Sequence, residues 1–140
     1  MQFYLSSKCP LPGTSADELM KLARQEFHYI QKRTPRRQAH VRSLYFGKDK
    51  VFINQFWDHL NQKNRRDKVR RLRLYTCAID LICNTRLVPD TTQNPNNSDE
   101  SLHRFGGKTA TGELFYVQIK ENKKSNRKDF MSVFPAKIEK

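Results

Sequence analysis

The sequence has few cysteines and no long apolar run. Only three of its 140 residues are cysteine, and no two form a Cys-x-x-Cys pair, which argues against both a disulfide framework and a zinc site. Cys77 and Cys83 lie in an apolar segment and are predicted to be small core residues, whereas Cys9 is predicted to be a surface thiol. No segment approaches the roughly 18 apolar residues of a membrane span, and residues 1–12 do not resemble a signal peptide. We therefore expect a cytoplasmic protein with no membrane partner.

Common catalytic motifs are also missing. The sequence has no P-loop, no dinucleotide-binding fingerprint and no nucleophile elbow, and we expect no cofactor. Its 14 acidic residues are scattered, which gives no support to a nuclease site built from two metal ions and clustered carboxylates. Any nuclease chemistry is therefore expected to be metal-independent, with the 2′-hydroxyl of RNA as the nucleophile.

Positive charge is abundant and clustered. The chain has 27 Lys and Arg residues and a formal net charge of +13, and the segment Lys63–Arg73 holds seven cations and one carboxylate. Such a segment repels itself, so its presence on an ordered element predicts a polyanionic partner, above all the phosphate backbone of a nucleic acid, with RNA favoured over DNA. Charge used only for solubility, or for binding an acidic protein, is the alternative.

The first half of the chain predicts helices and one hairpin. At this length we expect a single folding unit, divided into a lead-in and helix over residues 1–40 and a basic α+β domain over residues 41–136. Residues 1–14 are expected to be irregular. The capping-box pattern of Ser15 and Glu18 predicts a helix from Ser15 that Pro35 ends. Val41–Phe46 and Val51–Ile53 predict a hairpin.

Two further helices are expected in the middle of the chain. Asn54 is predicted to cap the first of them, which has one apolar stripe made of Ile53, Phe56, Trp57 and Leu60. The second spans Asp67–Cys83, either continuous with the first or separated from it by a break near Asn64. Its wide apolar surface predicts the central core helix.

The remainder predicts a long loop and a β-meander. Residues 84–101 are rich in Asn, Thr, Ser, Asp and Pro and are expected to be a loop. Strands are then predicted at Ser101–Phe105, Glu113–Glu121 and Asp129–Pro135. The first turn is expected at Gly106-Gly107 and Thr109–Gly112, and the second, charged and flexible, over Lys123–Lys128. In the third strand, Met131 and Val133 are predicted to alternate with Phe130, Ser132 and Phe134. The fold class that follows is α+β, with N-terminal helices packed on a C-terminal antiparallel β-sheet.

His59 is the first candidate for chemistry. It lies off the apolar stripe of its helix and four residues before Lys63, and Arg66, Arg70 and Arg73 continue the same face if the helix is continuous. Nearby cations favour the neutral imidazole, which can act as a general base toward a ribose 2′-hydroxyl. The alternative is a surface histidine hydrogen-bonded to Asp58 or to the backbone.

A second group lies on the predicted sheet. If the sheet face that carries this group is concave and covered by the basic helix, the group would form a phosphate-binding cleft. The group consists of His103, Arg104, Lys108, Gln118, Lys120 and Ser132. The alternative is an exposed face whose charges prevent edge pairing. Six aromatic residues near cations could stack on RNA bases, although most are expected in the core: Tyr29, Tyr45, Phe46, Phe105, Tyr116 and Phe134.

Three segments together resemble a known superfamily. They are residues 51–60 with the basic helix that follows, residues 115–120, and residues 130–135, which read Phe-Met-Ser-Val-Phe-Pro. They resemble the phage-borne nuclease-like domains of the superfamily named after barnase, EndoU, the colicins E5 and D, and RelE. The resemblance spans residues 41–136 and implies metal-independent RNA cleavage on a scaffold of helices and an antiparallel sheet.

The resemblance implies four active-site residues. They are His59 as general base, Arg71 and Lys120 as phosphate stabilisers, and Ser132 as an orienting hydroxyl. The cations predicted to bind nucleic acid are Lys63, Arg65, Arg66, Lys68, Arg70, Arg73, Arg104 and Lys108. The implied function is an endoribonuclease of toxin or phage-defence type, for which an acidic antitoxin or inhibitor would be a fitting partner. A nucleic-acid-binding module without catalysis, or a basic adaptor for an acidic protein, is the alternative.

Overall fold

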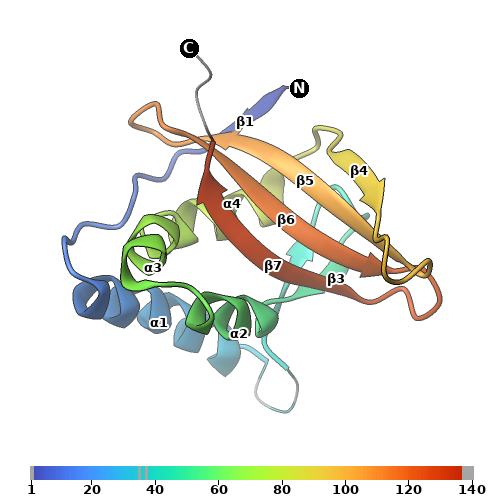
Figure 1. Ribbon diagram of the computed structural model, residues 1–140, viewed down its shortest axis with the longest axis horizontal. Coiled ribbons are helices and arrows are strands. Elements are labelled where there is room, and N and C mark those ends of the chain that lie inside the picture. The colour runs from blue at the N-terminus through green and yellow to red at the C-terminus, as the bar shows by residue number, and fades with distance from the viewer. Residues whose placement is uncertain (1, 35, 37, 137–140) are drawn as a thin grey trace.

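The computed structural model describes residues 2–34, 36 and 38–136 as an α+β fold (Figure 1). Its elements, in chain order, are β1 (Phe3–Leu5), α1 (Ala16–Lys32), β2 (His40–Ser43), β3 (Asp49–Phe52), α2 (Gln55–Asn61), α3 (Arg65–Leu72), α4 (Tyr75–Asn84), β4 (Asp90–Gln93), β5 (Glu100–Lys108), β6 (Leu114–Asn122) and β7 (Lys128–Pro135). No helix within these described ranges has the length and apolar content to cross a membrane.

Helix α1 begins as its capping pattern predicted. The Ser15 hydroxyl accepts a hydrogen bond from the backbone N–H of Glu18 at 3.2 Å and lies 3.1 Å from the Glu18 carboxylate, so it satisfies one of the free N–H groups of the first turn. The buried side chains follow at helical spacing and are Leu19, Ala23, Phe27 and Ile30. The helix ends at Lys32; Pro35, which was expected to end it, lies outside the described residues.

The segment expected to hold two helices contains three. Asn64 separates α2 from α3, and its side chain accepts a hydrogen bond from the N–H of Asp67 at 2.9 Å. A further break precedes Tyr75, so the prediction of one helix over Asp67–Cys83 was wrong. Leu72 and Leu74 are both buried, yet a straight helix would set them about 200° apart. The break allows both to enter the core, and α4, which is buried over most of its surface, is the predicted core helix.

The sheet is mixed, which corrects the expectation of an antiparallel one. Its order is β1-β5-β6-β7-β3-β2, with β4 also paired to β5. The meander of β5, β6 and β7 is antiparallel as predicted, but β1 pairs with β5 and β3 pairs with β7 in parallel. The helices are not N-terminal as a group either, since α2, α3 and α4 lie between the hairpin and the meander. Pairing between distant segments decides strand direction, and local patterns do not encode it.

Two strands lie in segments that were expected to be irregular. Strand β1 lies in the lead-in, and β4 lies in the segment expected to be a loop. All four side chains of β4 are exposed, so the strand has no apolar alternation that would reveal it.

Strand β5 also continues through the predicted turn at Gly106-Gly107. A Cβ on Gly107 would overlap the Phe115 ring and lie 2.8 Å from Leu81 Cδ1, so this glycine permits close packing within the strand.

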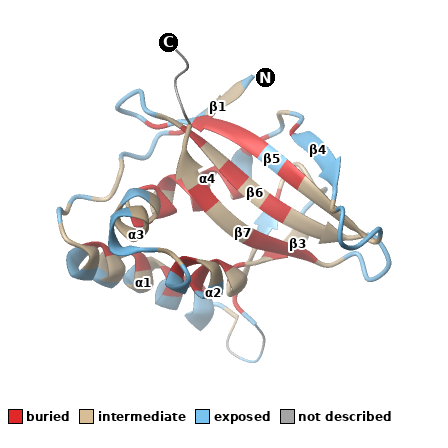
Figure 2. Cartoon of the chain, in the orientation of Figure 1, coloured by how far each residue is buried: buried red, intermediate tan, exposed pale blue. Residues whose placement is uncertain are grey.

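The central strands bury one face and leave the other open. Burial alternates along β6, where Phe115, Val117 and Ile119 are buried (Figure 2). Helix α4 passes behind β5 and β6 on the buried side (Figure 1). The opposite side of these strands, called the open face from here on, is bordered by α2 and α3 beside β7.

A β-bulge interrupts the alternation of β7. Gln118 pairs with Ser132, but its neighbour Ile119 pairs with Phe130, which leaves Met131 as an extra residue. Phe130 and Val133 are therefore both fully buried, although strict alternation had placed them on opposite faces. Bulges re-aim the side chains beside them, and this one lies at the centre of the open face.

Candidate functional site

A hollow of about 540 Å³ lies on the open face where α2 and α3 meet the sheet. It is lined by Gln55, His59, Lys63, Arg71, Asn94, Glu100, Leu102, Gln118, Lys120, Met131, Ser132 and Phe134. The structure thus brings together all four residues predicted to be catalytic, His59, Arg71, Lys120 and Ser132, from four separate elements. One predicted nucleic-acid contact, Lys63, lines the same hollow, which is called the His59 hollow below.

Strand geometry explains how the sheet residues reach the hollow. Gln118 and Lys120 alternate with buried Val117 and Ile119, so both project from the open face. Ser132 pairs with Gln118 in the strand register, and Met131, the extra residue of the bulge, also lines the hollow. The bulge therefore places two consecutive residues of β7 in one site.

Core packing fixes the position of His59. Phe56 on α2 stacks on Phe130 of β7, with ring centroids 4.9 Å apart and planes 7° from parallel. His59 lies three residues later, at the edge of the buried side of α2, and is half-buried. A rigid aromatic contact between the helix and the sheet thus holds the imidazole over the hollow.

The environment of His59 favours its neutral form. Burial lowers the pKa of His59, and the charges of Lys120 and Lys63 lower it further, while Asp58 opposes them. The rings of His28, His40 and His103 each hydrogen-bond to another protein group, but in the described parts of the chain the His59 ring has no such bond. Asp58 acts on His59 through charge alone, contrary to the alternative of a hydrogen-bonded surface histidine.

Lys120 is held in place by one carboxylate. Its Nζ lies 3.7 Å from Glu100 Oε2, and both side chains are largely buried. The amide of Asn94 donates to the other Glu100 oxygen at 2.9 Å, which fixes the carboxylate. The long ion pair orients the ammonium and leaves hydrogen-bond donors available for a phosphate.

Arg71 is a desolvated cation with unused donor capacity. Its guanidinium lies 5.5 Å from the centre of the Phe134 ring, and its Nε is buried without a hydrogen-bond partner among the described residues. Burial lowers the pKa of Arg71, with Asp67 opposing this effect, yet a guanidinium stays charged in proteins. Binding of an anion here would be favourable, because it would supply the missing hydrogen-bond acceptor and the opposite charge to a buried cation.

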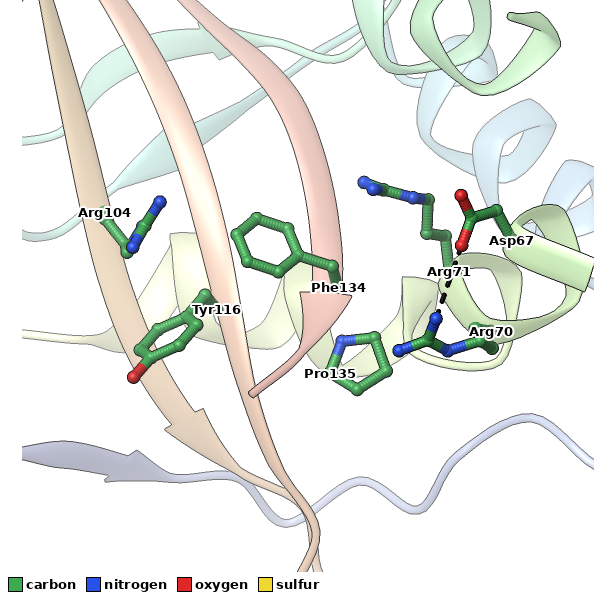
Figure 3. Close-up of a pocket in the computed structure, with 7 residues that line it drawn as sticks. All are labelled: Asp67, Arg70, Arg71, Arg104, Tyr116, Phe134 and Pro135. Carbon is green, nitrogen blue, oxygen red and sulfur yellow. Dashed lines mark hydrogen bonds and ion pairs between the residues drawn. The ribbon is translucent and has the colours of Figure 1, made fainter. Parts of the chain in front are cut away.

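A second hollow of about 480 Å³ adjoins the first and is lined by Asp67, Arg70, Arg71, Arg104, Tyr116, Phe134 and Pro135 (Figure 3). It shares Arg71 and Phe134 with the His59 hollow and is called the aromatic hollow below. Two more predicted nucleic-acid contacts, Arg70 and Arg104, lie here. Of the six aromatic candidates, Phe105 is buried and Tyr45 and Phe46 pack on the core, so Tyr29, Tyr116 and Phe134 remain accessible.

The other predicted cations do not reach either hollow. Arg73 pairs with Glu113 at 3.2 Å, and Arg65 lies 4.0 Å from Asp17 on the surface. Arg66 and Lys108 are exposed, and Lys68 is half-buried. Because α3 is a separate helix, Arg66 and Arg73 do not continue the face of His59, as a continuous helix would have required.

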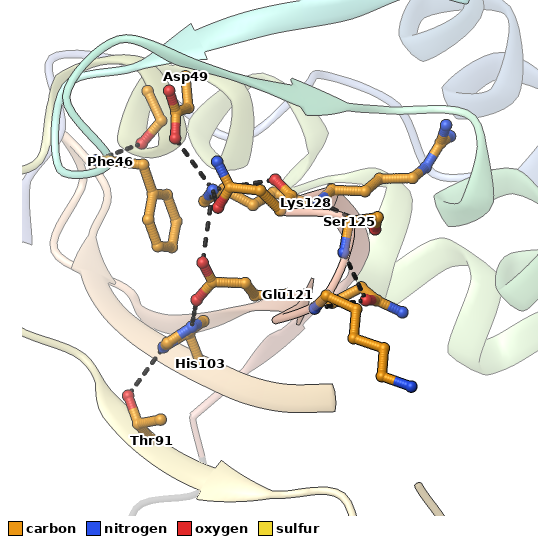
Figure 4. Close-up of polar contacts among 12 residues, drawn as sticks. Phe46, Asp49, Thr91, His103, Glu121, Ser125 and Lys128 are labelled. Carbon is orange, nitrogen blue, oxygen red and sulfur yellow. Dashed lines mark hydrogen bonds and ion pairs between the residues drawn. The ribbon is translucent and has the colours of Figure 1, made fainter. Parts of the chain in front are cut away.

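His103 lies on the covered side of the sheet, so its grouping with the open-face residues was wrong. Its ring nitrogens lie 2.8 Å from Thr91 Oγ1 and 2.8 Å from Glu121 Oε1. Glu121 also pairs at 3.4 Å with Lys128, whose Nζ lies 3.0 Å from Asp49 (Figure 4). Lys128 had been expected in a flexible turn, but its side chain is 2% exposed.

Sequence reasoning missed Glu100, Asn94 and the role of Met131. Glu100 and Asn94 lie in the segment that was expected to be a loop, and Met131 enters the site only through the bulge. A signal existed for Glu100, because it lies two and four residues before Leu102 and Arg104 and so shares their face of β5. No group of three or more His, Cys, Asp or Glu side chains in the described ranges could hold a metal ion.

These two hollows combine a neutral imidazole, an ammonium, a guanidinium, a hydroxyl and exposed aromatic rings. A neutral imidazole can accept a proton, and the two cations can bind a phosphate and stabilise charge that develops on it. No protein-family model, curated protein or solved structure matches the chain.

Proposed function

We propose that this protein is a metal-independent endoribonuclease whose active site is the His59 hollow. The observation that carries the proposal is the convergence of His59, Lys120, Arg71 and Ser132 around one cavity. Each of the four has unused hydrogen-bonding or proton-accepting capacity, or is held by a single long ion pair. The combination fits phosphodiester cleavage by the neighbouring ribose hydroxyl.

The reaction proceeds in one displacement at phosphorus. Neutral His59 takes the proton of the 2′-hydroxyl as the 2′-oxygen attacks the adjacent phosphorus, and the bond from phosphorus to the 5′-oxygen breaks. Arg71 and Lys120 bind the phosphate oxygens and stabilise the charge of the pentavalent transition state. The Lys120 ammonium donates a proton to the departing 5′-oxygen, and Ser132 orients the phosphate. The products are a 2′,3′-cyclic phosphate and a 5′-hydroxyl.

The experiment is cleavage of a single-stranded RNA in the presence of EDTA. The wild-type protein should produce fragments that end in cyclic phosphate, and His59→Ala should be slower by about 10²–10⁴-fold, the usual contribution of a general base. His28→Ala is the matched control, because His28 is exposed on α1 and bonds to Gln31. An RNA with one 2′-deoxyribose should resist cleavage at that position only.

The alternative of a nucleic-acid-binding module draws on the same cations. Arg71, with its unpartnered Nε, would bind a phosphate whether or not a bond is broken. Under this alternative, RNA stays intact in every arm of the experiment, and binding depends strongly on salt. Cleavage that is equal in wild-type protein and His59→Ala would reject the assigned site.

The proposed biological role is that of a toxin or phage-defence enzyme, which rests on the resemblance of residues 51–60, 115–120 and 130–135. A net charge of +13 would favour fast association with an acidic inhibitor protein. Such an inhibitor should compete with RNA for the two hollows, so added inhibitor should block RNA binding as well as cleavage.

A further inference from the structure

An aromatic row crosses the open face beside the His59 hollow. Phe3 pairs with Gly106, Gly106 with Tyr116, and Tyr116 with Phe134 in the sheet register. The ring centroids are 6.1 Å apart for Phe3 and Tyr116 and 5.8 Å apart for Tyr116 and Phe134. Gly106 has no side chain, so the rings of β1 and β6 can meet across β5.

This row is accessible, unlike the aromatic residues of the core. Phe3, Tyr116 and Phe134 are all half-buried, whereas Phe56, Tyr75, Phe105, Phe115 and Phe130 are in the core. Figure 3 shows Tyr116 and Phe134 beside one another on adjacent strands of the aromatic hollow. An apolar surface of this kind, kept out of the core in a strongly charged protein, is suited to a ligand with flat apolar faces.

Arginine side chains lie beside the row. The Arg104 guanidinium lies 5.3 Å from the Tyr116 ring centre and 5.6 Å from that of Phe134, and Arg71 lies 5.5 Å from Phe134. Guanidinium planes stack on bases and also bind phosphates. The row therefore offers both kinds of contact that a nucleotide needs.

We infer that the aromatic hollow is a stacking site for unpaired nucleobases of single-stranded RNA. Aromatic side chains on neighbouring strands of an open sheet face can each hold one base, and stacking accepts any base because every base has a π-face. Duplex RNA keeps its bases stacked internally and cannot enter. An acidic peptide would match the arginines but would leave the rings unused.

The position of the site sets which nucleotides it holds. Arg71 and Phe134 line both hollows, so the base on Phe134 belongs to a nucleotide adjacent to the phosphate bound by Arg71. Further bases would follow along the row toward Tyr116 and Phe3, on one side of that phosphate. This placement relative to a cleaved bond rests on the proposed function, whereas base stacking itself does not.

The test measures binding in the absence of cleavage. Full-length His59→Ala protein is titrated into fluorescent 2′-O-methyl RNA by anisotropy, with three probes: a single strand, the same strand with abasic positions, and a hairpin duplex. The single strand should bind more tightly than the abasic strand by roughly 5- to 150-fold for each stacked base. Equal affinity for these two strands would overturn the inference, and this comparison requires no change to the rings.

Substitutions then locate the stacking site. Tyr116→Leu and Phe134→Leu keep apolar volume but remove the ring, and each should weaken binding of the normal strand by roughly 5- to 150-fold. Neither should change binding of the duplex. Tyr29→Leu is the matched control, since Tyr29 is an exposed tyrosine beside Arg33 on another part of the surface. Equal losses with normal and abasic strands would overturn the inference, because they would indicate a purely structural role of the rings.

Failure of the inference and failure of the proposed function are distinguishable. Base-dependent binding by a protein that never cuts RNA would support the stacking site and reject the ribonuclease. Cleavage that depends on His59 but is unaffected by the ring substitutions, together with equal binding of normal and abasic strands, would support the ribonuclease and reject the stacking site.

Discussion

The two faces of the central sheet each hold a histidine, a lysine, a glutamate and a hydroxyl. On the open face these are His59, Lys120, Glu100 and Ser132, and on the covered face they are His103, Lys128, Glu121 and Thr91 (Figure 4). The residue types are nearly the same, so composition alone does not separate a reactive site from a structural one.

The two clusters differ in how many of their hydrogen-bond donors and acceptors have partners. Both ring nitrogens of His103 have partners at 2.8 Å, and Lys128 Nζ lies within 3.4 Å of Asp49, Glu121 and Asn126. Lys120 has a single ion pair at 3.7 Å. A fully partnered buried network fixes one arrangement of the core, whereas unused hydrogen-bonding capacity at the edge of a cavity is available to a ligand.

The largest expected difference comes from removing each lysine charge. Lys128→Met should lower the free energy of unfolding by about 1–3 kcal/mol, because it leaves the largely buried Glu121 carboxylate and the half-exposed Asp49 carboxylate without their cation. Lys120→Met should cost only about 0.5–1.5 kcal/mol of stability, because its single ion pair is long and the Glu100 carboxylate keeps the hydrogen bond from Asn94. It should slow RNA cleavage by about 10²–10³-fold, as expected for loss of transition-state stabilisation. Urea denaturation and single-turnover cleavage of both variants measure the two effects.

The comparison fails if the effects do not separate. Lys120→Met that unfolds as readily as Lys128→Met would make the open-face lysine structural. Folded Lys128→Met that cleaves as slowly as Lys120→Met would show that the covered network takes part in the reaction.

The pH dependence of cleavage should follow His59. Its pKa is lowered from the ordinary value of about 6.5 by burial and then by Lys120 and Lys63, and only the neutral imidazole accepts a proton. Cleavage should therefore fall as the pH falls through this lowered pKa. In Lys120→Met the His59 pKa should move upward, which an NMR titration of the imidazole measures without any cleavage. An unchanged pKa would contradict the shared site.

The same shift has a small consequence for stability. The unfolded chain takes up a proton at His59 at a higher pH than the folded protein does, so the imidazole disfavours folding as the pH falls below about 6.5. Above that pH His59 contributes nothing of this kind. His59→Ala should therefore lose less stability than the wild-type protein between neutral and mildly acidic pH, as urea denaturation at each pH would show.

Local sequence patterns were sufficient to predict the elements whose apolar residues repeat at helical or strand spacing. The Ser15 cap and the apolar spacing of α1 predicted that helix, and alternation along residues 114–122 predicted β6 and its two faces. The edge strands β1 and β4 could not be predicted in this way. Their stability comes from hydrogen bonds to β5, and β4 has no buried side chain.

The residues of the candidate site also differ in whether local sequence patterns could predict their positions. His59, Lys120 and Ser132 lie off the apolar faces of their elements, and together with Arg71 they stand in or next to the segments that carry the superfamily resemblance. His103 was misplaced although alternation puts it on the face of Phe105, which is buried. Met131 could not have been placed, because an extra residue in one strand reverses the alternation and leaves no mark in the sequence.

The smallest expected effects come from the two hydroxyls. Ser132→Ala should leave the free energy of unfolding unchanged and slow cleavage by about 2- to 13-fold, the equivalent of one hydrogen bond of about 0.5–1.5 kcal/mol. Thr91→Val keeps the branched shape but removes the hydroxyl that lies 2.8 Å from His103 Nδ1. It should cost about 0.5–1.5 kcal/mol of stability and leave cleavage unchanged. Because Thr91 lies on the exposed strand β4, water can replace its hydroxyl, and the lower end of this range is expected.

This pair tests the difference between the two faces directly, because each variant loses one hydroxyl from a strand of the same sheet. Urea denaturation and single-turnover cleavage should show opposite results for Ser132→Ala and Thr91→Val. If Ser132→Ala were neutral in both measurements, the phosphate would be oriented by Arg71 and Lys120 alone. If Thr91→Val slowed cleavage, His103 would have to influence the open face through β5 or β6, and the two clusters would form one functional unit.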